Sequence, residues 1–356
     1  MHSSNTNIRS FGFLSAIICL LLAVFWMTPS FARSTDSLKI MVVDSSQGEP
    51  YRTVREAMLA ELQRRGFTLG SRLQIKHLSL GNFGGPARHI WNEALTQRYD
   101  LIFVNGTAAA LAFRDLALGA EMPFIFAAVT DPVGIGIIEG FNSPPVSNFT
   151  GVSYPVDVET RLRFIRRVMP DAATIGLVYA DMPQSKSYRR WLEQALEKPE
   201  FDSLKVIYRS VPYIKSEGGH VRMTRLAQRH ILELDSQVDV FISPNDQMGV
   251  QAPFAQMVYK TATKPLIGLG KKDVDEQWGA TMSVYPSLEG MGTCAAAMIA
   301  HWHESGSISE IEARWPQIGV AFDTPKLKQF NLRVDLSIDN VVVGIGGQQG
   351  GCGAGP

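Results

Sequence analysis

Short β-type runs and amphipathic helical stretches alternate in two rounds along this chain, and this alternation constrains its fold more than any other feature. In the first round, Leu38–Val43 is an apolar run typical of a buried strand, and Pro50–Arg65 follows with one apolar helical face. The second round opens with the run Thr174–Tyr179 and the helical stretch Ser185–Leu196. Short connections between such elements make the strands parallel and place helices on both faces of each sheet. The sequence therefore predicts an α/β chain of two doubly wound parallel-sheet lobes.

The same patterns predict the remaining elements of both rounds. The further expected strands are Arg72–Leu78, Asp100–Val104, Phe124–Val129, Asn148–Val152, Lys205–Val211, Val238–Ser243, Pro265–Gly268 and Ala280–Val284. The further expected helices are Ala87–Gln97, Ala108–Leu118, Val156–Val168, Val221–Leu234, Met248–Thr261 and Leu288–His303, with an additional helix start at Pro132. Ligands of open α/β sheets bind at the carboxyl ends of the strands, so we expect a site along that edge of each lobe.

Residues 1–32 have the pattern of an export signal rather than of a folded element. Phe11–Met27 is almost unbroken apolar sequence after Arg9, and Pro29 ends the run. Ser30–Ala32 then has the small-x-small pattern that signal peptidase recognises. We expect cleavage after Ala32 and a periplasmic product. The alternative is an uncleaved N-terminal membrane anchor, because the apolar run is near the lower limit for spanning a bilayer.

The composition excludes several classes of function. The chain has 356 residues with 34 basic and 34 acidic side chains, so it lacks the basic excess of a nucleic-acid binder. Its 3 cysteines are too few and too scattered for a disulfide framework or a zinc cluster. The glycine-rich end, Gly344–Pro356, is expected to be disordered. We therefore expect no nucleic-acid partner, no metal and no other cofactor.

No catalytic motif accompanies the fold pattern. Gly151–Pro155 lacks the second glycine of a nucleophile elbow, and Gly134–Gly136 has the wrong spacing for a dinucleotide fingerprint. His301 and His303 would lie on different faces of a helix, which favours a solvated, frayed helix end over a metal site. Four arginines of one expected helix are interpreted as a solvated basic face, with a partner contact as the alternative: Arg161, Arg163, Arg166 and Arg167. The chain is not expected to be an enzyme.

A long motif in the first round resembles a known family. Phe126–Gly134 reads FAAVTDPVG, and Asn148–Ser153 reads NFTGVS after an intervening loop. This combination resembles the substrate-binding proteins of ABC transporters, in particular the group that includes the binders of tryptophan and other aromatic amino acids. The similarity extends over most of the chain and includes NGTAA at Asn105–Ala109 and SPND at Ser243–Asp246.

The resemblance implies a type 1 periplasmic binding protein fold, in which a three-strand hinge joins the two lobes and no enzymatic activity is present. The three crossings are expected near Val152–Val156, Val284–Pro286 and Gly319–Phe322. Lobe 1 would then comprise residues 38–152 and 286–318, and lobe 2 would comprise residues 153–285 and 319–338. Closure about the hinge would bury a small ligand between the lobes.

Polar residues at the expected strand ends are the candidate ligand contacts. Gly106 and Thr107 open a helix, where free N–H groups favour a carboxylate. Asp131 is either a ligand contact or an N-cap, and Tyr179 is either an aromatic wall or lobe packing. Asp246 or Asp131 would accept a ligand donor, and the long stem of Lys271 could equally reach solvent. The full predicted set is Gln47, Asn105, Gly106, Thr107, Thr130, Asp131, Tyr179, Asn245, Asp246 and Lys271.

The sequence departs from the family pattern at positions where acidic residues commonly receive a ligand ammonium group. Leu269–Lys272 stands where a Ser and an acidic residue commonly follow the strand that ends at Gly268. Tyr285–Ser287 replaces an acidic position after the last hinge strand. These differences weaken the case for a zwitterionic amino acid and leave room for an anionic or neutral ligand.

The resemblance implies a function in transport. We expect an exported, monomeric solute-binding protein that captures an amino-acid-like molecule or a small carboxylate and delivers it to the permease subunits of an ABC transporter. The alternative is a periplasmic sensor of the same fold that reports to a membrane receptor. A periplasmic hydrolase is disfavoured because no nucleophile–base constellation is recognisable.

Overall fold

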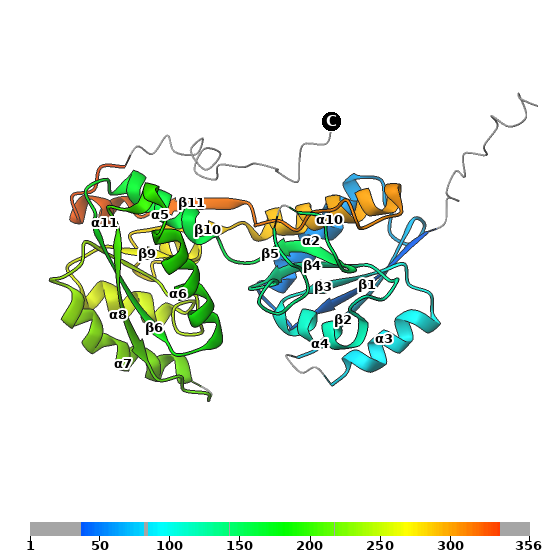
Figure 1. Ribbon diagram of the computed structural model, residues 1–356, viewed down its shortest axis with the longest axis horizontal. Coiled ribbons are helices and arrows are strands. Elements are labelled where there is room, and N and C mark those ends of the chain that lie inside the picture. Colours follow the sequence, from blue (N-terminus) through cyan, green and yellow to red (C-terminus); the bar gives the residue numbers. More distant parts are fainter. Residues whose placement is uncertain (1–36, 82–84, 142, 217, 335–356) are drawn as a thin grey trace, which may run out of the picture. The chain divides into compact units, whose positions relative to one another are not determined.

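The computed structural model describes residues 37–81, 85–141, 143–216 and 218–334, which form two α/β lobes (Figure 1). Each lobe is built on one mostly or wholly parallel sheet, so the predicted fold class is confirmed. The expected export signal at residues 1–32 and the glycine-rich end at residues 344–356 both lie outside the described residues.

Lobe 1 has a five-stranded sheet in the order β2-β1-β3-β4-β5, and all of its neighbouring strands are parallel. Its strands are β1 (Leu38–Asp44), β2 (Leu73–Ser79), β3 (Leu101–Asn105), β4 (Phe124–Val129) and β5 (Phe149–Ser153). Its helices are α2 (Tyr51–Arg64), α3 (Ala87–Thr96), α4 (Thr107–Ala117) and, from much later in the sequence, α10 (Leu288–Ser305). Each element lies within a few residues of its predicted range.

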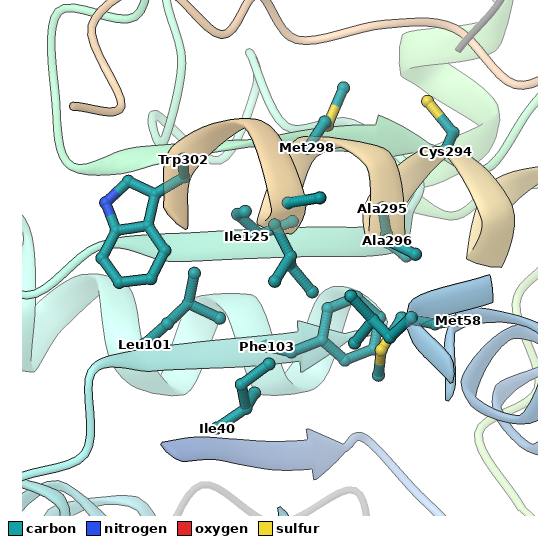
Figure 2. Packing of buried hydrophobic residues seen from close by; sticks show 14 of the residues in the cluster. Ile40, Met58, Leu101, Phe103, Ile125, Cys294, Ala295, Ala296, Met298 and Trp302 are labelled. Atoms are coloured by element: carbon teal, nitrogen blue, oxygen red, sulfur yellow. The ribbon is translucent and has the colours of Figure 1, made fainter. Parts of the chain in front are cut away.

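Both faces of the lobe 1 sheet are covered by helices. Along β1, Ile40 packs on the face beneath α2 and α10, and Met41 packs on the face beneath α3 and α4. Figure 2 shows the first of these faces, where α10 lies across Ile125 and Phe103. Strands that are buried on both faces have few positions for polar side chains along their length. The polar side chains of this lobe therefore lie mainly in the loops at the edges of the sheet.

Lobe 2 has a six-stranded sheet in the order β11-β10-β9-β8-β6-β7. Its strands are β6 (Thr174–Ala180), β7 (Lys205–Val211), β8 (Val240–Ile242), β9 (Leu266–Gly268), β10 (Met282–Pro286) and β11 (Ile318–Phe322). Its helical segments are α5 (Val158–Val168), α6 (Pro183–Leu196), the 3₁₀ turn η1 (Pro199–Phe201), α7 (Gly219–Leu234), α8 (Ala252–Thr261), α9 (Lys272–Asp275) and α11 (Thr324–Gln329).

Two expectations about these elements are wrong. The strands that the sequence predicted are parallel to their neighbours, whereas β11, expected only as a crossing, pairs with β10 in the antiparallel direction. The helix expected from Met248 begins only at Ala252, since the Asp246 side chain accepts the N–H groups of Met248 and Gly249 and holds them in a turn. Pro132 starts a turn over residues 132–136 rather than a helix.

The short helices α9 and α11, of 4 and 6 residues, show no periodicity that a sequence pattern could reveal.

The described chain passes between the two sheets three times. It leaves lobe 1 after β5, returns from β10 into α10, and re-enters lobe 2 with β11. The third crossing was expected at Gly319–Phe322, but these residues are part of β11 and pair with β10. Arg314 still pairs with Val152 in lobe 1, so this crossing lies between Arg314 and Ile318. The exact residue limits of the lobes stay a prediction.

The end of α10 differs from the expected frayed and solvated helix end. The helix continues to Ser305, and Gly306 ends it with a φ of 73°. His303 packs edge-on against Phe67 with ring centroids 5.3 Å apart, and Trp302 is buried. Within the described ranges no group of three or more His, Cys or acidic side chains is arranged to hold a metal ion. None of the helices described has the length and apolar character needed to span a bilayer.

Gly292 provides a test of how closely α10 packs on α2. A Cβ at this position would lie 2.2 Å from the carbonyl oxygen of Val54 and 2.7 Å from the Cβ of Ala57. Alanine normally stabilises a helix interior relative to glycine by about 1 kcal/mol, but here the backbone of α2 occupies the space of the methyl group. We expect Gly292→Ala to lower the free energy of unfolding by about 1–3 kcal/mol, measured by urea denaturation.

The control for this substitution is Gly85→Ala, because nothing lies within 4 Å of the Cβ position at Gly85. We expect this variant to differ from the wild type by less than about 0.5 kcal/mol. A Gly292→Ala variant as stable as the control would show that the two helices do not approach each other as described.

Candidate functional site

Buried polar side chains organise the carboxyl edge of the lobe 1 sheet. Asp44, at the end of β1, accepts a hydrogen bond from Asn105 Nδ2 at 3.0 Å and pairs with Arg55. His77 Nε2 lies 2.8 Å from the same carboxylate, and burial together with the charge of Arg55 lowers the pKa of His77. Asn105 also donates to the carbonyl of Tyr51 at 2.9 Å and is fully buried. The predicted site residue Asn105 therefore fixes the loops of this edge.

At the start of α4 the backbone lies close to Ser45, and one of the backbone N–H groups there is already hydrogen-bonded within the protein. Gly106 has a φ of 103°, and a Cβ there would lie 2.5 Å from Ser45 Oγ, so only glycine fits. Ser45 Oγ accepts the N–H of Ala109 at 2.9 Å, and Thr107 Oγ1 accepts the N–H of Thr130 at 3.0 Å. The structure thus brings Gly106, Thr107 and Thr130 together. One of the amides at the start of α4 has an acceptor within the protein.

Asp131 caps the turn that follows β4. Its Oδ1 accepts the N–H of Gly134 at 2.7 Å, and the Ile135 N–H bonds to the Asp131 carbonyl at 3.0 Å. This bonding accounts for a turn at Pro132 in place of the expected helix. Gln47, in contrast, lies in the exposed loop after β1.

Asp246 is the most fully bonded of the predicted site residues. Its Oδ2 accepts the Ala180 N–H at 2.7 Å and the Ser185 hydroxyl at 3.0 Å. Its Oδ1 accepts the N–H groups of Met248 and Gly249, each at 2.9 Å. Burial raises the pKa of Asp246, and these four donors oppose that rise. The carboxylate therefore ties the ends of β6 and β8 together, which favours a structural role.

The other predicted residues of lobe 2 differ in their surroundings. Tyr179 is buried, packs in the lobe 2 core and accepts a hydrogen bond from Arg189 Nη1 at 3.2 Å. Lys271 is exposed, and its Nζ lies 3.5 Å from Asp275 Oδ2 on the short helix α9. Asn245 is buried, and its Nδ2 has no hydrogen-bond partner among the described residues. Of these three side chains, Asn245 has the strongest structural support as a ligand contact.

A small hollow of about 50 Å³ lies at the carboxyl edge of lobe 2, next to the crossing segments. It is lined by Asn245 after β8, Gly270 after β9, and Tyr154 on the first crossing. The lining also includes Arg161 and Asp273, two charged side chains that the sequence analysis did not predict as site residues. Polar groups from the strand ends and from the segments that cross between the lobes therefore line this hollow.

Arg161 is buried, which corrects the expected solvated basic face. Only 4% of its surface is exposed, whereas Arg166 and Arg167 of the same helix are exposed as expected. Phe164 and Val168 lie three and seven positions later, so they share one buried face of α5 with Arg161. Its Nη1 donates to the carbonyl of Gly268 at 3.3 Å, while its Nε has no acceptor in the described part of the chain.

Burial governs the protonation of the groups around Arg161. It raises the pKa of Tyr154 to about 12, so the phenol stays protonated and can donate a hydrogen bond. Burial also raises the pKa of Asp273, whose Oδ2 accepts the N–H groups of Leu269 at 2.7 Å and Gly270 at 3.0 Å. Asp273 acts on the loop after β9 much as Asp246 acts on the loop after β8.

A larger hollow of about 470 Å³ has an aromatic wall. Trp315 stacks on Phe141 with ring centroids 4.0 Å apart and meets Trp191 edge-on at 6.4 Å. The predicted residues Thr130 and Asp131 line the same hollow. Aromatic walls with a few polar groups are typical of small-molecule sites. No sequence pattern predicts that these aromatic residues meet, because they come from separate loops and a helix.

The predicted site residues do not meet in one hollow. Thr130 and Asp131 line the larger one, Asn245 lines the smaller one, and the other seven line neither. Several of those seven instead shape the loops through hydrogen bonds within the protein, as Asn105 and Asp246 do.

Comparisons with known proteins agree with this architecture. A family model described as ABC transporter substrate binding protein matches residues 39–313. A tyrosine-binding protein of Clostridioides difficile (strain R20291) is 23% identical over 349 residues, covering 94% of this chain and 96% of the relative.

Solved structures show the same fold. The ligand-free, open structure of a substrate binding protein with adhesive properties from Clostridium difficile has a TM-score of 0.70 at 22% identity and covers 84% of this chain and 96% of its own. An ABC domain from Streptococcus pneumonia in complex with L-Trp has a TM-score of 0.61 at 18% identity and covers 86% of this chain and 98% of its own.

The bonding of Asp246 predicts a large effect on stability. Asp246→Ala removes the acceptor of four donors, so we expect the free energy of unfolding to fall by about 2–4 kcal/mol in urea denaturation. Asp181→Ala is the matched control, because Asp181 is 54% exposed and pairs only at the surface with Lys186. We expect that control to change stability by less than about 1 kcal/mol. Equal effects of the two substitutions would contradict the structural role of Asp246.

Proposed function

Because this chain belongs to the family of ABC transporter substrate binding proteins, we propose that it is an exported receptor that captures a small molecule and delivers it to an ABC transporter. The observation that carries this proposal is the family match over residues 39–313, which includes strands of both lobes. Proteins of this family are binding proteins without enzymatic activity and typically act in the periplasm or outside the cell. An export signal at residues 1–32 would take the chain there.

We propose an amino-acid-like molecule or a small carboxylate as the ligand. One relative is a tyrosine-binding protein, and one structural relative is in complex with L-Trp, which supports this chemical class. Tyr285 and Leu269–Lys272 stand where the family pattern commonly has acidic residues for an ammonium group. The acid group of the ligand therefore has more support in this chain than an amino group.

Closure of the two lobes would complete the site. The ten predicted residues stay our proposed contact set, with the loops after β3, β4 and β8 supplying most of it. Asn105 and Asp246 hold those loops through internal bonds, which would preorganise them for a ligand. The receptor would act as a monomer and present both closed lobes to the permease subunits.

A thermal-shift screen tests ligand binding. A ligand that binds only the native state should raise the melting temperature, since a concentration of about 100 times Kd adds about 2.7 kcal/mol of stability. The panel comprises L-tyrosine, L-tryptophan, other amino acids, small carboxylates, purines and sugars, with the D-enantiomer of each amino-acid hit as its control. Failure of every compound to raise the melting temperature would contradict a role in small-solute capture.

Uptake of the identified compound separates delivery from sensing. Cells that lack this protein should lose most of the uptake if the receptor supplies a transporter. Unchanged uptake would instead support the periplasmic sensor.

Export predicts a defined N-terminus for the mature protein. Cleavage after Ala32 would leave a chain that begins Arg33-Ser34-Thr35, which mass spectrometry of a periplasmic extract can detect. Retention of residues 1–32 in a membrane fraction would favour the uncleaved anchor instead.

A further inference from the structure

We propose that the small hollow lined by Arg161 and Asn245 is the subsite that holds the carboxylate of an organic acid. This inference rests on the proposed function and assigns the acid group of the ligand to a particular place, the carboxyl edge of lobe 2. The sequence pattern instead favours the start of α4 in lobe 1 for an anionic group.

The state of Arg161 is the first observation in support. Its side chain is 4% exposed, and no carboxylate of the described residues lies within the 4.0 Å of an ion pair with it. Its one hydrogen bond, to the Gly268 carbonyl at 3.3 Å, is long, and its Nε has no acceptor in the described ranges. The charge of the Asp273 carboxylate interacts with Arg161, but no ion pair forms between them. A buried charge without an ion-pair partner opposes folding. A ligand anion would supply the missing acceptor and the missing charge.

Asn245 provides a second, independent observation. It is 9% exposed and comes from the loop after β8, whereas Arg161 comes from α5. Its Nδ2 also has no acceptor within the described part of the chain, and it lines the same hollow. The protonated phenol of Tyr154 lines this hollow as well. Donors from three separate segments therefore surround one small space.

The charges that line the hollow favour an anion. Arg161 and Lys272 supply two positive charges, and Asp273 is the one carboxyl group in the lining. The Oδ2 atom of Asp273 is already occupied by the N–H groups of Leu269 and Gly270. The lining thus carries an excess of positive charge, although the Asp273 carboxylate offsets part of the charge of Arg161.

The size of the hollow favours a head group over a whole molecule. Its volume of about 50 Å³ is well below the roughly 300–1,000 Å³ of a complete small-molecule site. A planar carboxylate matches the planar guanidinium of Arg161, which can bind it through two parallel hydrogen bonds. The remainder of the ligand would extend out of the hollow, toward the space that lobe closure encloses.

The start of α4 is a weaker anion site by the same criteria. The N–H of Ala109 is already bonded to Ser45 Oγ, and the side-chain N–H donor of the buried Asn105 is bonded to Asp44 and to the Tyr51 carbonyl. Arg55, a cation on that edge, is paired with Asp44. Arg161 has no such partner in the described residues.

Matched acids and amides measure the role of the carboxylate directly. The probes are L-tyrosine and L-tyrosinamide, L-tryptophan and L-tryptophanamide, and succinate and succinamide, with phosphate and sulfate as separate arms. Binding to the purified protein is measured by calorimetry. We expect at least one acid to bind and its amide to bind about 10- to 100-fold more weakly, as for a lost hydrogen bond to a charged group.

Two substitutions at Arg161 and one control assign the effect to this residue. Arg161→Met should weaken binding of the acid by about 10- to 100-fold, and Arg161→Lys should recover part of that loss because it restores the charge. Arg167→Met is the control, since Arg167 is exposed on the same helix, and it should bind like the wild type. In the absence of ligand, Arg161→Met should melt at the same temperature as the wild type or above it, because it removes a buried charge that forms no ion pair with the described residues. A purely structural arginine would lower the melting temperature instead.

The possible outcomes separate this inference from the proposed function. An acid that binds Arg161→Met as tightly as the wild type overturns the carboxylate subsite and leaves a binding protein in place. Should Arg161→Met fail to fold, Arg161→Lys and the acid–amide comparison on the wild type decide the question. Binding of phosphate or sulfate in preference to every acid overturns the carboxylate assignment. Binding of only neutral compounds from the wider thermal-shift panel also overturns it, while supporting the proposed function.

Discussion

The structure depends on one constraint, which is that polar side chains are largely restricted to the edges at which the parallel strands end. The inner strands β3 and β4 of the lobe 1 sheet are buried on both faces and carry almost only apolar side chains, and polar groups lie at the carboxyl ends of the strands. Asp44 bonds to Asn105 there, and Asp246 joins β6 to β8 through four donors. The loops that could meet a ligand are therefore shaped by buried hydrogen bonds at the same edge.

Most polar groups of these edges are satisfied within the protein. Asp246 and Asp273 each accept backbone N–H groups from the loop that follows a strand, and burial raises the pKa of both. Such carboxylates hold a loop in one conformation but have less capacity left for a ligand. Arg161 differs because it is buried with an Nε that lacks an acceptor among the described residues. Binding sites require groups of this kind, and folding disfavours them.

Sequence patterns predicted the order of the elements well and their ends less well. β4 and β7 have the predicted bounds, and β1 ends one residue after its predicted range. The turn at Pro132 and the late start of α8 were missed for one shared reason. In both places an aspartate, Asp131 or Asp246, bonds to N–H groups two or three residues later and forms a turn in place of a helix.

The sequence by itself determined the fold class and the family, because strand and helix periodicities and a contiguous motif are local properties of the chain. Tertiary structure decided which polar groups remain without a partner. Arg161 and Arg167 are the same residue type on one helix, yet only Arg161 faces the sheet, and the spacing of Phe164 and Val168 was the one sequence signal of its burial. Its surroundings, Gly268 at the end of β9 and Asn245 in the loop after β8, come from far along the chain. Pairing and burial depend on such distant residues, so the local sequence around Arg161 could not show that it lines a hollow with an unused donor.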